Sequence, residues 1–300
     1  DQFPEGSTKT CYVNPANPSE SVLYREPRWE MIGFKLVFVL VFGGVGLGIV
    51  IAGLCSWKST RRENEQKALQ PDKPWTWKPN WATGVVRSSN RPEMWGAIVI
   101  AAFWNAIAIP SAILAVGSVI AKEAEPLALL VLIFPAVGLG LLAWAIHSVA
   151  KWRKFGESAF EMASVPGVVG GQLGGIVRVP VHIQPEDGFH VTLTCVNRVT
   201  TGSGKHRHTS ENILWQDTRL MKHEILERDP TRSAIPVLFG IPYDCRQTDD
   251  ADSDNAIVWR LETKAAVPGI DYGAKFEVPV FRTEASSADF KLDESAIAPY

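Results

Sequence analysis

The residues best suited to chemistry gather in one stretch, TTGSGKHRHTSENILWQDT, at positions 200–218. Its glycine-lysine pair resembles the end of a phosphate-binding loop, whose full pattern is G-x-x-x-x-G-K-[ST]. Val199 stands where that motif requires its first glycine, and His206 stands where it requires serine or threonine. The motif fails at both positions, so we do not expect this stretch to hold nucleotide phosphates.

Metal binding is the second chemistry that this stretch suggests. His206 and His208 alternate, so on a strand both rings could face one side, with His190 or His223 as a third ligand. No carboxylate or thiolate has a fixed spacing to them, and we favour a solvated basic tip of a long hairpin over a metal site. The candidate interaction residues at this tip are Lys205, His206, Arg207 and His208.

The remaining chemical signatures are incomplete. DDADSDN (249–255) offers alternating aspartates that resemble a calcium loop, but Asn255 replaces its turn glycine and Leu261 its final glutamate. The four cysteines lie far apart with no CxxC pair, and no G-x-S-x-G occurs. We therefore predict no catalytic residues and no cofactor, and we favour a non-enzymatic protein while leaving that question open.

Three apolar stretches dominate the first half of the chain, at residues 34–54, 94–120 and 127–149. Each reaches the ~20 residues that a helix needs to cross a hydrocarbon core of ~30 Å. The sequence therefore predicts three transmembrane helices within residues 31–155. Pro110 is expected to kink the second span, and Asn105 and His147 are polar insertions for which an interhelical hydrogen bond is the favoured interpretation.

Tryptophan and glycine residues indicate how these spans meet their surroundings. Gly44 and Gly48 form a GxxxG pair, which favours close packing of another helix. Indole rings prefer the headgroup layer, because the ring is apolar while its N–H needs a partner. In the loop at 57–93, the tryptophans among lysines either contact the anionic leaflet or brace the soluble domain against the helices. The candidate membrane-interface residues are Trp29, Trp57, Trp75, Trp77, Trp81, Trp95 and Trp152.

Basic residues set the expected orientation. The loop at 57–93 holds eight Lys/Arg and the segment KWRK (151–154) holds three, whereas the first 30 residues hold three basic and five acidic residues. The positive-inside rule places the long loop and the C-terminal half in the cytoplasm and the N-terminus outside. Because exporting a polar N-terminal segment needs a signal or an earlier span, we expect one upstream of Asp1.

The second half changes to short alternating apolar runs separated by Gly, Pro and Asp. Residues 156–300 carry 14 Lys/Arg against 21 Asp/Glu, whereas residues 1–155 carry 16 against 11, and neither half has the basic excess of a nucleic-acid binder. Period-two patterning predicts one antiparallel β-sandwich over 156–284, followed by a polar tail at 285–300. The expected strands are 176–183, 190–199, 212–216, 235–242, 256–265 and 275–281.

The chain resembles a known family over nearly its whole length. CYVNPANPSESVLYRE, PWTWKPNWATG, FGESAFEMASVPGVVGGQLGG and PGIDYGAKFEVPVF are similar to segments of the bacterial membrane proteins grouped as domain of unknown function 3592. That resemblance implies a bacterial inner-membrane protein, with residues 1–30 a remnant of a small extracytoplasmic β-segment. It also implies a cytoplasmic sandwich of Ig-like or arrestin-like type, and it supplies no reaction.

The favoured function is a membrane-anchored interaction or scaffold module, an accessory subunit of a membrane complex. Its expected partners are the lipid bilayer and either a protein or a second copy of the chain, with no nucleic acid and no predictable small-molecule ligand. Two alternatives stay open. One is a metal-dependent enzyme or regulator that uses the histidines of the β-domain, and the other is an accessory subunit of a transporter or channel.

Overall fold

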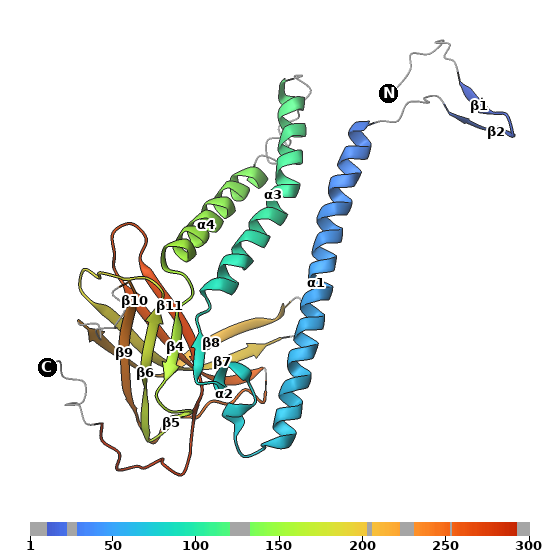
Figure 1. Ribbon diagram of the computed structural model, residues 1–300. Helices are drawn as coiled ribbons and strands as arrows, with labels where there is room; N and C mark the ends of the chain where they lie inside the picture. Colours follow the sequence, from blue (N-terminus) through green and yellow to red (C-terminus); the bar gives the residue numbers. More distant parts are fainter. Residues whose placement is uncertain are drawn as a thin grey trace. The chain divides into compact units, whose positions relative to one another are not determined.

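Three long helices lie in the first half of the chain. The computed structural model describes residues 11–22, 29–120, 133–202, 206–222, 231–252 and 254–292. The helices are α1 (Trp29–Leu69), α3 (Asn90–Ile120) and α4 (Ile133–Phe155) (Figure 1). Each has a segment long and apolar enough to cross a membrane: Phe42–Leu69, Asn90–Ile113 and Ile133–Phe155. The protein is therefore a membrane protein with three candidate spans, although residues 127–132 of the third predicted stretch lie outside the described residues.

Helix α1 is longer than a bilayer requires. Its 41 residues span roughly 60 Å at 1.5 Å per residue, about twice the hydrocarbon thickness. Apolar side chains of its first part, such as Val39 and Ile49, are each 68% exposed, which suits a lipid environment. The second part is polar, from Lys58 onward, so α1 continues beyond the predicted span.

One polar side chain joins α3 to α4. Asn105 is buried, and its Nδ2 donates a hydrogen bond to the carbonyl oxygen of Gly138 at 3.1 Å. Trp104 stacks on Phe134 and donates from Nε1 to that residue's carbonyl oxygen at 2.8 Å. The expected interhelical hydrogen bond of Asn105 is thus present, and this residue gives no support to a conduction path.

Gly138→Ala is expected to weaken this helix pair by about 0.6–2 kcal/mol, the range for interhelical hydrogen bonds in membranes. A Cβ at Gly138 would lie 2.5 Å from Asn105 Oδ1, so the amide must leave its partner. Gly140→Ala is the matched control, because no atom lies within 4 Å of its added Cβ. Detergent-titrated unfolding followed by tryptophan fluorescence measures the difference, and equal curves for both variants would contradict the assignment.

The N-terminal segment contains a small hairpin. Strands β1 (Tyr12–Asn14) and β2 (Asn17–Val22) pair antiparallel. Asn14 and Asn17 both donate side-chain hydrogen bonds to Glu20, at 3.0 and 3.2 Å. This hairpin lies within residues 1–30, of which residues 1–10 and 23–28 lie outside the described residues, and its origin as a remnant of an extracytoplasmic β-segment stays a prediction.

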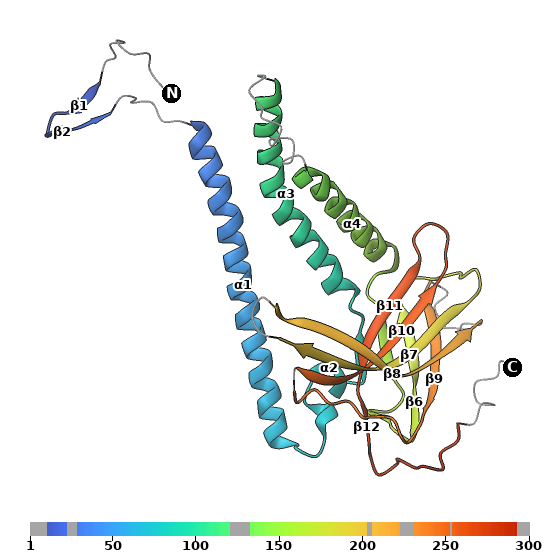
Figure 2. The ribbon, with the colours of Figure 1, turned by 180° about the vertical axis from the view of Figure 1, so that it is seen from behind.

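The C-terminal half, together with one short strand that precedes α3, forms two four-stranded antiparallel sheets (Figures 1 and 2). The first has the order β11-β10-β7-β8 and the second β3-β4-β6-β9. Strands β5 and β12 form a separate parallel pair, which an all-antiparallel prediction misses. The strands are β3 (Val85–Arg87), β4 (Ala159–Met162), β5 (Gly167–Val168), β6 (Gly171–Val179), β7 (Phe189–Thr201), β8 (His208–Met221), β9 (Ser233–Ile241), β10 (Asn255–Ala265), β11 (Tyr272–Val278) and β12 (Val280–Phe281).

Both sheets contribute to one hydrophobic core. Trp259 and Leu193 of the first sheet and Phe160 and Phe239 of the second are fully buried in the same cluster. Alternation along β7 produces this inward face, because Phe189, Val191, Leu193 and Cys195 are buried in turn. Desolvation raises the pKa of the Cys195 thiol to about 12, as expected of a packed rather than a reactive cysteine.

The predicted boundaries of this β-domain are too narrow at both ends. Strand β3, formed by residues before α3, pairs with β4, so the domain includes part of the tryptophan-rich loop as well as residues after 156. Ser287 donates from its backbone N–H to the carbonyl oxygen of Gly170 at 2.9 Å. The chain therefore stays attached past the predicted boundary at 284, and residues 293–300 of the predicted tail lie outside the described residues.

Candidate functional site

Strand β8 is one of the two edge strands of the first sheet, at the end opposite β11. It is 14 residues long, and β7 is its only neighbour in that sheet, with a register that runs from Phe189↔Met221 to Thr201↔His208. Among the described residues, β8 makes no backbone ladder on its other side. Such an edge presents unpaired N–H and C=O groups that another strand can bind.

Apolar side chains accompany these unpaired backbone groups. The exposed fractions of Ile213, Leu214 and Leu220 are 64%, 46% and 44%. The β7–β8 register shifts by one residue between Cys195, which pairs with Trp215, and Val196, which pairs with Ile213. Leu214 is therefore the extra residue of a β-bulge. Trp215 anchors this point, because its ring lies 5.5 Å from that of the buried Trp259. The bulge therefore leaves two consecutive apolar side chains in solvent beside a fixed indole.

Charged residues brace the outer face of the same sheet. Glu211 of β8 accepts hydrogen bonds from both terminal nitrogens of Arg260 at 3.0 and 3.1 Å, and from Arg198 Nε at 3.2 Å. The hydrogen bonds from Arg260 are the main cause that holds the pKa of Glu211 below its usual range. These three side chains tie β10, β7 and β8 together, so the exposed edge is held in place as part of a rigid sheet.

The predicted tip residues lie at the end of the β7–β8 hairpin. His206, Arg207 and His208 are exposed, whereas Lys205 lies outside the described residues. Arg207 Nη2 pairs with Asp254 Oδ1 at 2.8 Å, so its charge is partly neutralised by the chain itself. The described tip residues therefore form an exposed hairpin end with one ion pair among them and their described neighbours, and their role in an interaction stays a prediction.

His190, one of the two possible third metal ligands, lies far from the hairpin tip. His190 lies eleven residues before Thr201 on β7, roughly 36 Å away at 3.3 Å per residue, so it does not reach His206 or His208. Within the described ranges, no group of three His, Cys, Asp or Glu side chains could hold a metal ion. His223 lies outside the described residues.

The tryptophan-rich loop packs against the β-domain. It contains a 3-10 turn (Pro74–Thr76), α2 (Pro79–Ala82) and β3. Trp81 is 4% exposed, donates from Nε1 to the carbonyl oxygen of Glu277 at 3.1 Å, and contacts the ring of Phe281. Trp75 packs on the same ring at 5.7 Å. The membrane-interface prediction is therefore wrong for Trp81, because its ring completes the protein core.

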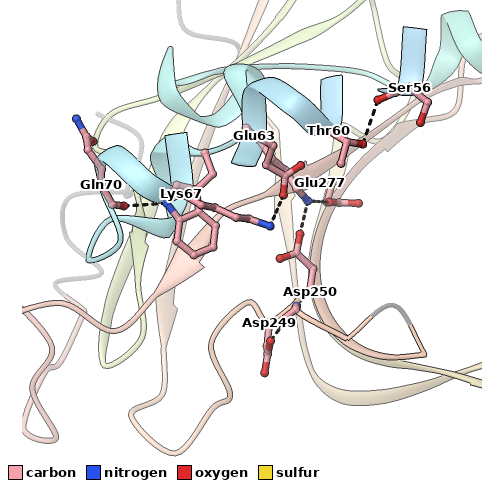
Figure 3. Close-up of polar contacts among 11 residues, drawn as sticks. Ser56, Thr60, Glu63, Lys67, Gln70, Asp249, Asp250 and Glu277 are labelled. Atoms are coloured by element: carbon pink, nitrogen blue, oxygen red, sulfur yellow. Dashed lines mark hydrogen bonds and ion pairs between the residues drawn. The ribbon is translucent and has the colours of Figure 1, made fainter. Parts of the chain in front are cut away.

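A partly exposed ion cluster fixes this loop (Figure 3). Lys78 Nζ lies 2.6 Å from Asp250 Oδ2 and 3.4 Å from Glu277 Oε1, and 4.0 Å from the Trp81 ring centroid. Burial alone would lower the pKa of Lys78, but hydrogen bonds to the two carboxylates and their charges outweigh it and raise the pKa. Lys78 therefore stays charged and links the loop to β11 and to the turn before β10.

Contacts between residues that are close in sequence hold the C-terminal end of α1. Lys67 Nζ pairs with Glu63 Oε1 at 2.8 Å, and Trp77 Nε1 donates to the carbonyl oxygen of Gln70 at 2.8 Å (Figure 3). Lys67 also lies over the Trp77 ring at 5.1 Å from its centroid. Trp77 is thus engaged with the end of α1, which favours the bracing interpretation for this residue too.

For the remaining tryptophans and for the GxxxG pair, contact with lipid or with another helix stays a prediction. Trp57 and Trp95 are 67% and 55% exposed, as headgroup contacts require, and Trp152 is half-buried. The side chain of Trp29 lies outside the described residues. An added Cβ at Gly44 or Gly48 meets no atom within 4 Å, so any helix that packs there belongs to something other than the described part of this chain.

Comparisons with known proteins add little to this site. No protein-family model matches the chain, and no curated protein matches it. Among solved structures, the chain is similar to Spo0M, a sporulation control protein from Bacillus subtilis, with 14% sequence identity and a TM-score of 0.28. The match covers 41% of this chain and 48% of that one, about half of its length. A TM-score this low carries no argument about fold or function.

Sequence reasoning identified the hairpin tip but missed the apolar edge beside it. The residues that it missed are Ile213 and Leu214, together with the Arg198–Glu211–Arg260 network. The run Ile213-Leu214-Trp215 was a usable signal, since three consecutive apolar residues break the period-two pattern of a half-buried strand. Such a break indicates a bulge or an exposed apolar position.

Proposed function

We propose that this protein is a membrane-anchored interaction module that binds an extended segment of a partner protein along β8. Added strands gain affinity from main-chain hydrogen bonds and specificity from side-chain contacts. The observation that carries the proposal is the long free edge of β8, with Ile213 and Leu214 exposed beside it. The module acts without catalysis, as a scaffold or accessory subunit of a membrane complex.

The cellular setting belongs to the same proposal. We place the β-domain, an Ig-like or arrestin-like sandwich of the kind found in the proteins grouped as domain of unknown function 3592, in the cytoplasm of a bacterium. The basic residues of the 57–93 loop and of 151–154 support this orientation in the inner membrane. The hairpin tip around His206 and Arg207 then lies at one end of the binding edge and contributes charge to partner selection.

Ile213→Lys is expected to reduce recovery of crosslinked partners at least about tenfold, because a charged group replaces an apolar contact in the centre of the edge. The experiment uses the full chain, crosslinked in native membranes, extracted in detergent and recovered by affinity tag, with partners quantified by mass spectrometry. Ile213 is 64% exposed, so the substitution removes little of the core and the variant should fold.

Val85→Lys is the matched control. It places the same charge on an exposed apolar position of β3, an edge strand of the second sheet that is only three residues long. Partner recovery should be unchanged in this variant. Equal recovery by Ile213→Lys and the unaltered chain would reject β8 as the binding edge, whereas equal loss in both variants would show that the effect is not specific to β8.

A further inference from the structure

A pocket lies where α4 ends against the β10–β11 hairpin. Lys154, in the last turn of α4, donates from Nζ to the carbonyl oxygens of Pro268 and Ile270 at 2.8 and 2.9 Å. The next residue, Phe155, packs edge-on against the buried Tyr272 at 5.3 Å between ring centroids. These contacts hold the helix end beside the hairpin (Figure 2), and the pocket beside them has a volume of about 530 Å³.

The acidic side chains that line this pocket are already engaged. Glu262 pairs with Lys264 at 3.0 Å and with Lys275 at 3.9 Å. Glu93 Oε1 accepts a hydrogen bond from the Ser89 hydroxyl at 2.6 Å. The third carboxylate, of Asp271, accepts one from the backbone N–H of Val267 at 3.2 Å. Each carboxylate in the pocket therefore has a partner within the protein.

Two nitrogen-bearing side chains of α4 also line the pocket. Unlike the carboxylates, they have no partner among the described residues. Neither Lys151 nor His147 makes a hydrogen bond or ion pair to any described residue, although both face the pocket. They are four residues apart, so they lie on the same face of α4, about 6 Å from each other along its axis. Lys151 is half-buried against β11, and its Nζ lies 3.2 Å from the point where a Cβ added to Gly273 would lie. A half-buried ammonium without a counter-ion indicates a site for an anion.

We infer that this pocket binds the phosphate of an anionic membrane lipid. His147 and Lys151 fall in the C-terminal half of the candidate span Ile133–Phe155, towards the end at which a span leaves the hydrocarbon and meets headgroups. The Lys151 ammonium contacts the phosphodiester, and His147, one turn closer to the membrane centre, donates to a phosphate or glycerol oxygen. The acyl chains lie along the apolar surface of α4 beyond His147.

Lys151→Gln tests this assignment in the full chain purified in detergent. Phosphatidylglycerol or phosphatidylcholine is titrated, and bound lipid is counted by native mass spectrometry. The unaltered protein is expected to retain phosphatidylglycerol in preference to phosphatidylcholine. Lys151→Gln is expected to lose about fivefold in phosphatidylglycerol affinity, the effect of one lysine near an anionic headgroup. Lys151→Arg should restore binding, which separates loss of the charge from damage to the fold.

Arg153→Gln is the matched control, because it removes one positive charge from an exposed position of the same helix turn, and Arg153 is not among the pocket's lining residues. Its phosphatidylglycerol affinity should stay within about twofold of the unaltered value. Equal losses in both glutamine variants would overturn the pocket in favour of general surface attraction. Displacement of the lipid by an equal concentration of inorganic phosphate would overturn the lipid and point to a soluble phosphate ligand.

Discussion

Replacing Trp81 with alanine is expected to lower the free energy of unfolding of the β-domain by about 3–5 kcal/mol, the cost of removing a buried tryptophan. Trp81 is 4% exposed and packs on Phe281, and its Nε1 donates to the carbonyl oxygen of Glu277. Lys78, which lies over the indole ring, would lose that contact as well. Urea unfolding of the full chain in detergent measures the change.

Two further variants make this result specific. Trp57→Ala removes an indole that is 67% exposed, and it should leave the urea midpoint of the β-domain unchanged. Trp81→Phe keeps one aromatic ring but removes the N–H donor and part of the buried surface, so it should cost about 1–3 kcal/mol, less than Trp81→Ala. Hydrogen exchange of the β11 amides should accelerate in Trp81→Ala. An unfolding midpoint for Trp81→Ala no lower than that of Trp57→Ala would refute the structural role of the loop.

Gly175→Ala is expected to lower the free energy of unfolding of the β-domain by about 3 kcal/mol, the upper end of the usual cost of overpacking. Gly175 pairs with Met162 at the end of the antiparallel β4–β6 ladder, and an added Cβ would collide with the carbonyl oxygen of Glu161 and with the ring of Phe160. Backbone cannot move aside as a flexible side chain can, so the collision separates two paired strands. Expression level and thermal unfolding of the detergent-purified chain report the loss.

The neighbouring glycine supplies the control for that prediction. In Gly174→Ala the added Cβ lies 3.3 Å from Leu238 Cδ1, the end of a side chain that can shift. The same substitution one position earlier should therefore cost less than about 1 kcal/mol. Similar unfolding temperatures for the two variants would contradict the close approach of β4 to Gly175.

The coarse organisation was readable from sequence because two periodicities are strong. Long apolar runs specify helices in lipid, and the alternation in residues 190–199 and 256–265 specifies strands that became β7 and β10. Strands β3 and β5, of three and two residues, were not predictable, because they form only when distant partners are present. Pro180 ended β6 earlier than predicted, since proline cannot donate to the ladder.

The candidate site was less predictable than the fold for a related reason. Which strand ends a sheet depends on strand order, and no local pattern in residues 208–221 encodes that β8 has one neighbour. The roles of Trp75 and Trp81 stayed ambiguous, because an aromatic ring beside lysines suits a membrane surface and a core equally well. Only the long-range contacts with Phe281 and Glu277 distinguish the two.

The attachment of the β-domain has a consequence for how partners are found. The start of α3 and the end of α4 both bind the β10–β11 hairpin. Asn90 donates to the carbonyl oxygen of Gly273, and Lys154 donates to that of Pro268. These described contacts tie both helix ends to the domain, so in the cytoplasmic placement that we propose its reach from the membrane is short. Proteins that share its bilayer meet it at high effective concentration, whereas soluble proteins must diffuse to the surface. Natural ligands of β8 should therefore be found among neighbours in the same membrane.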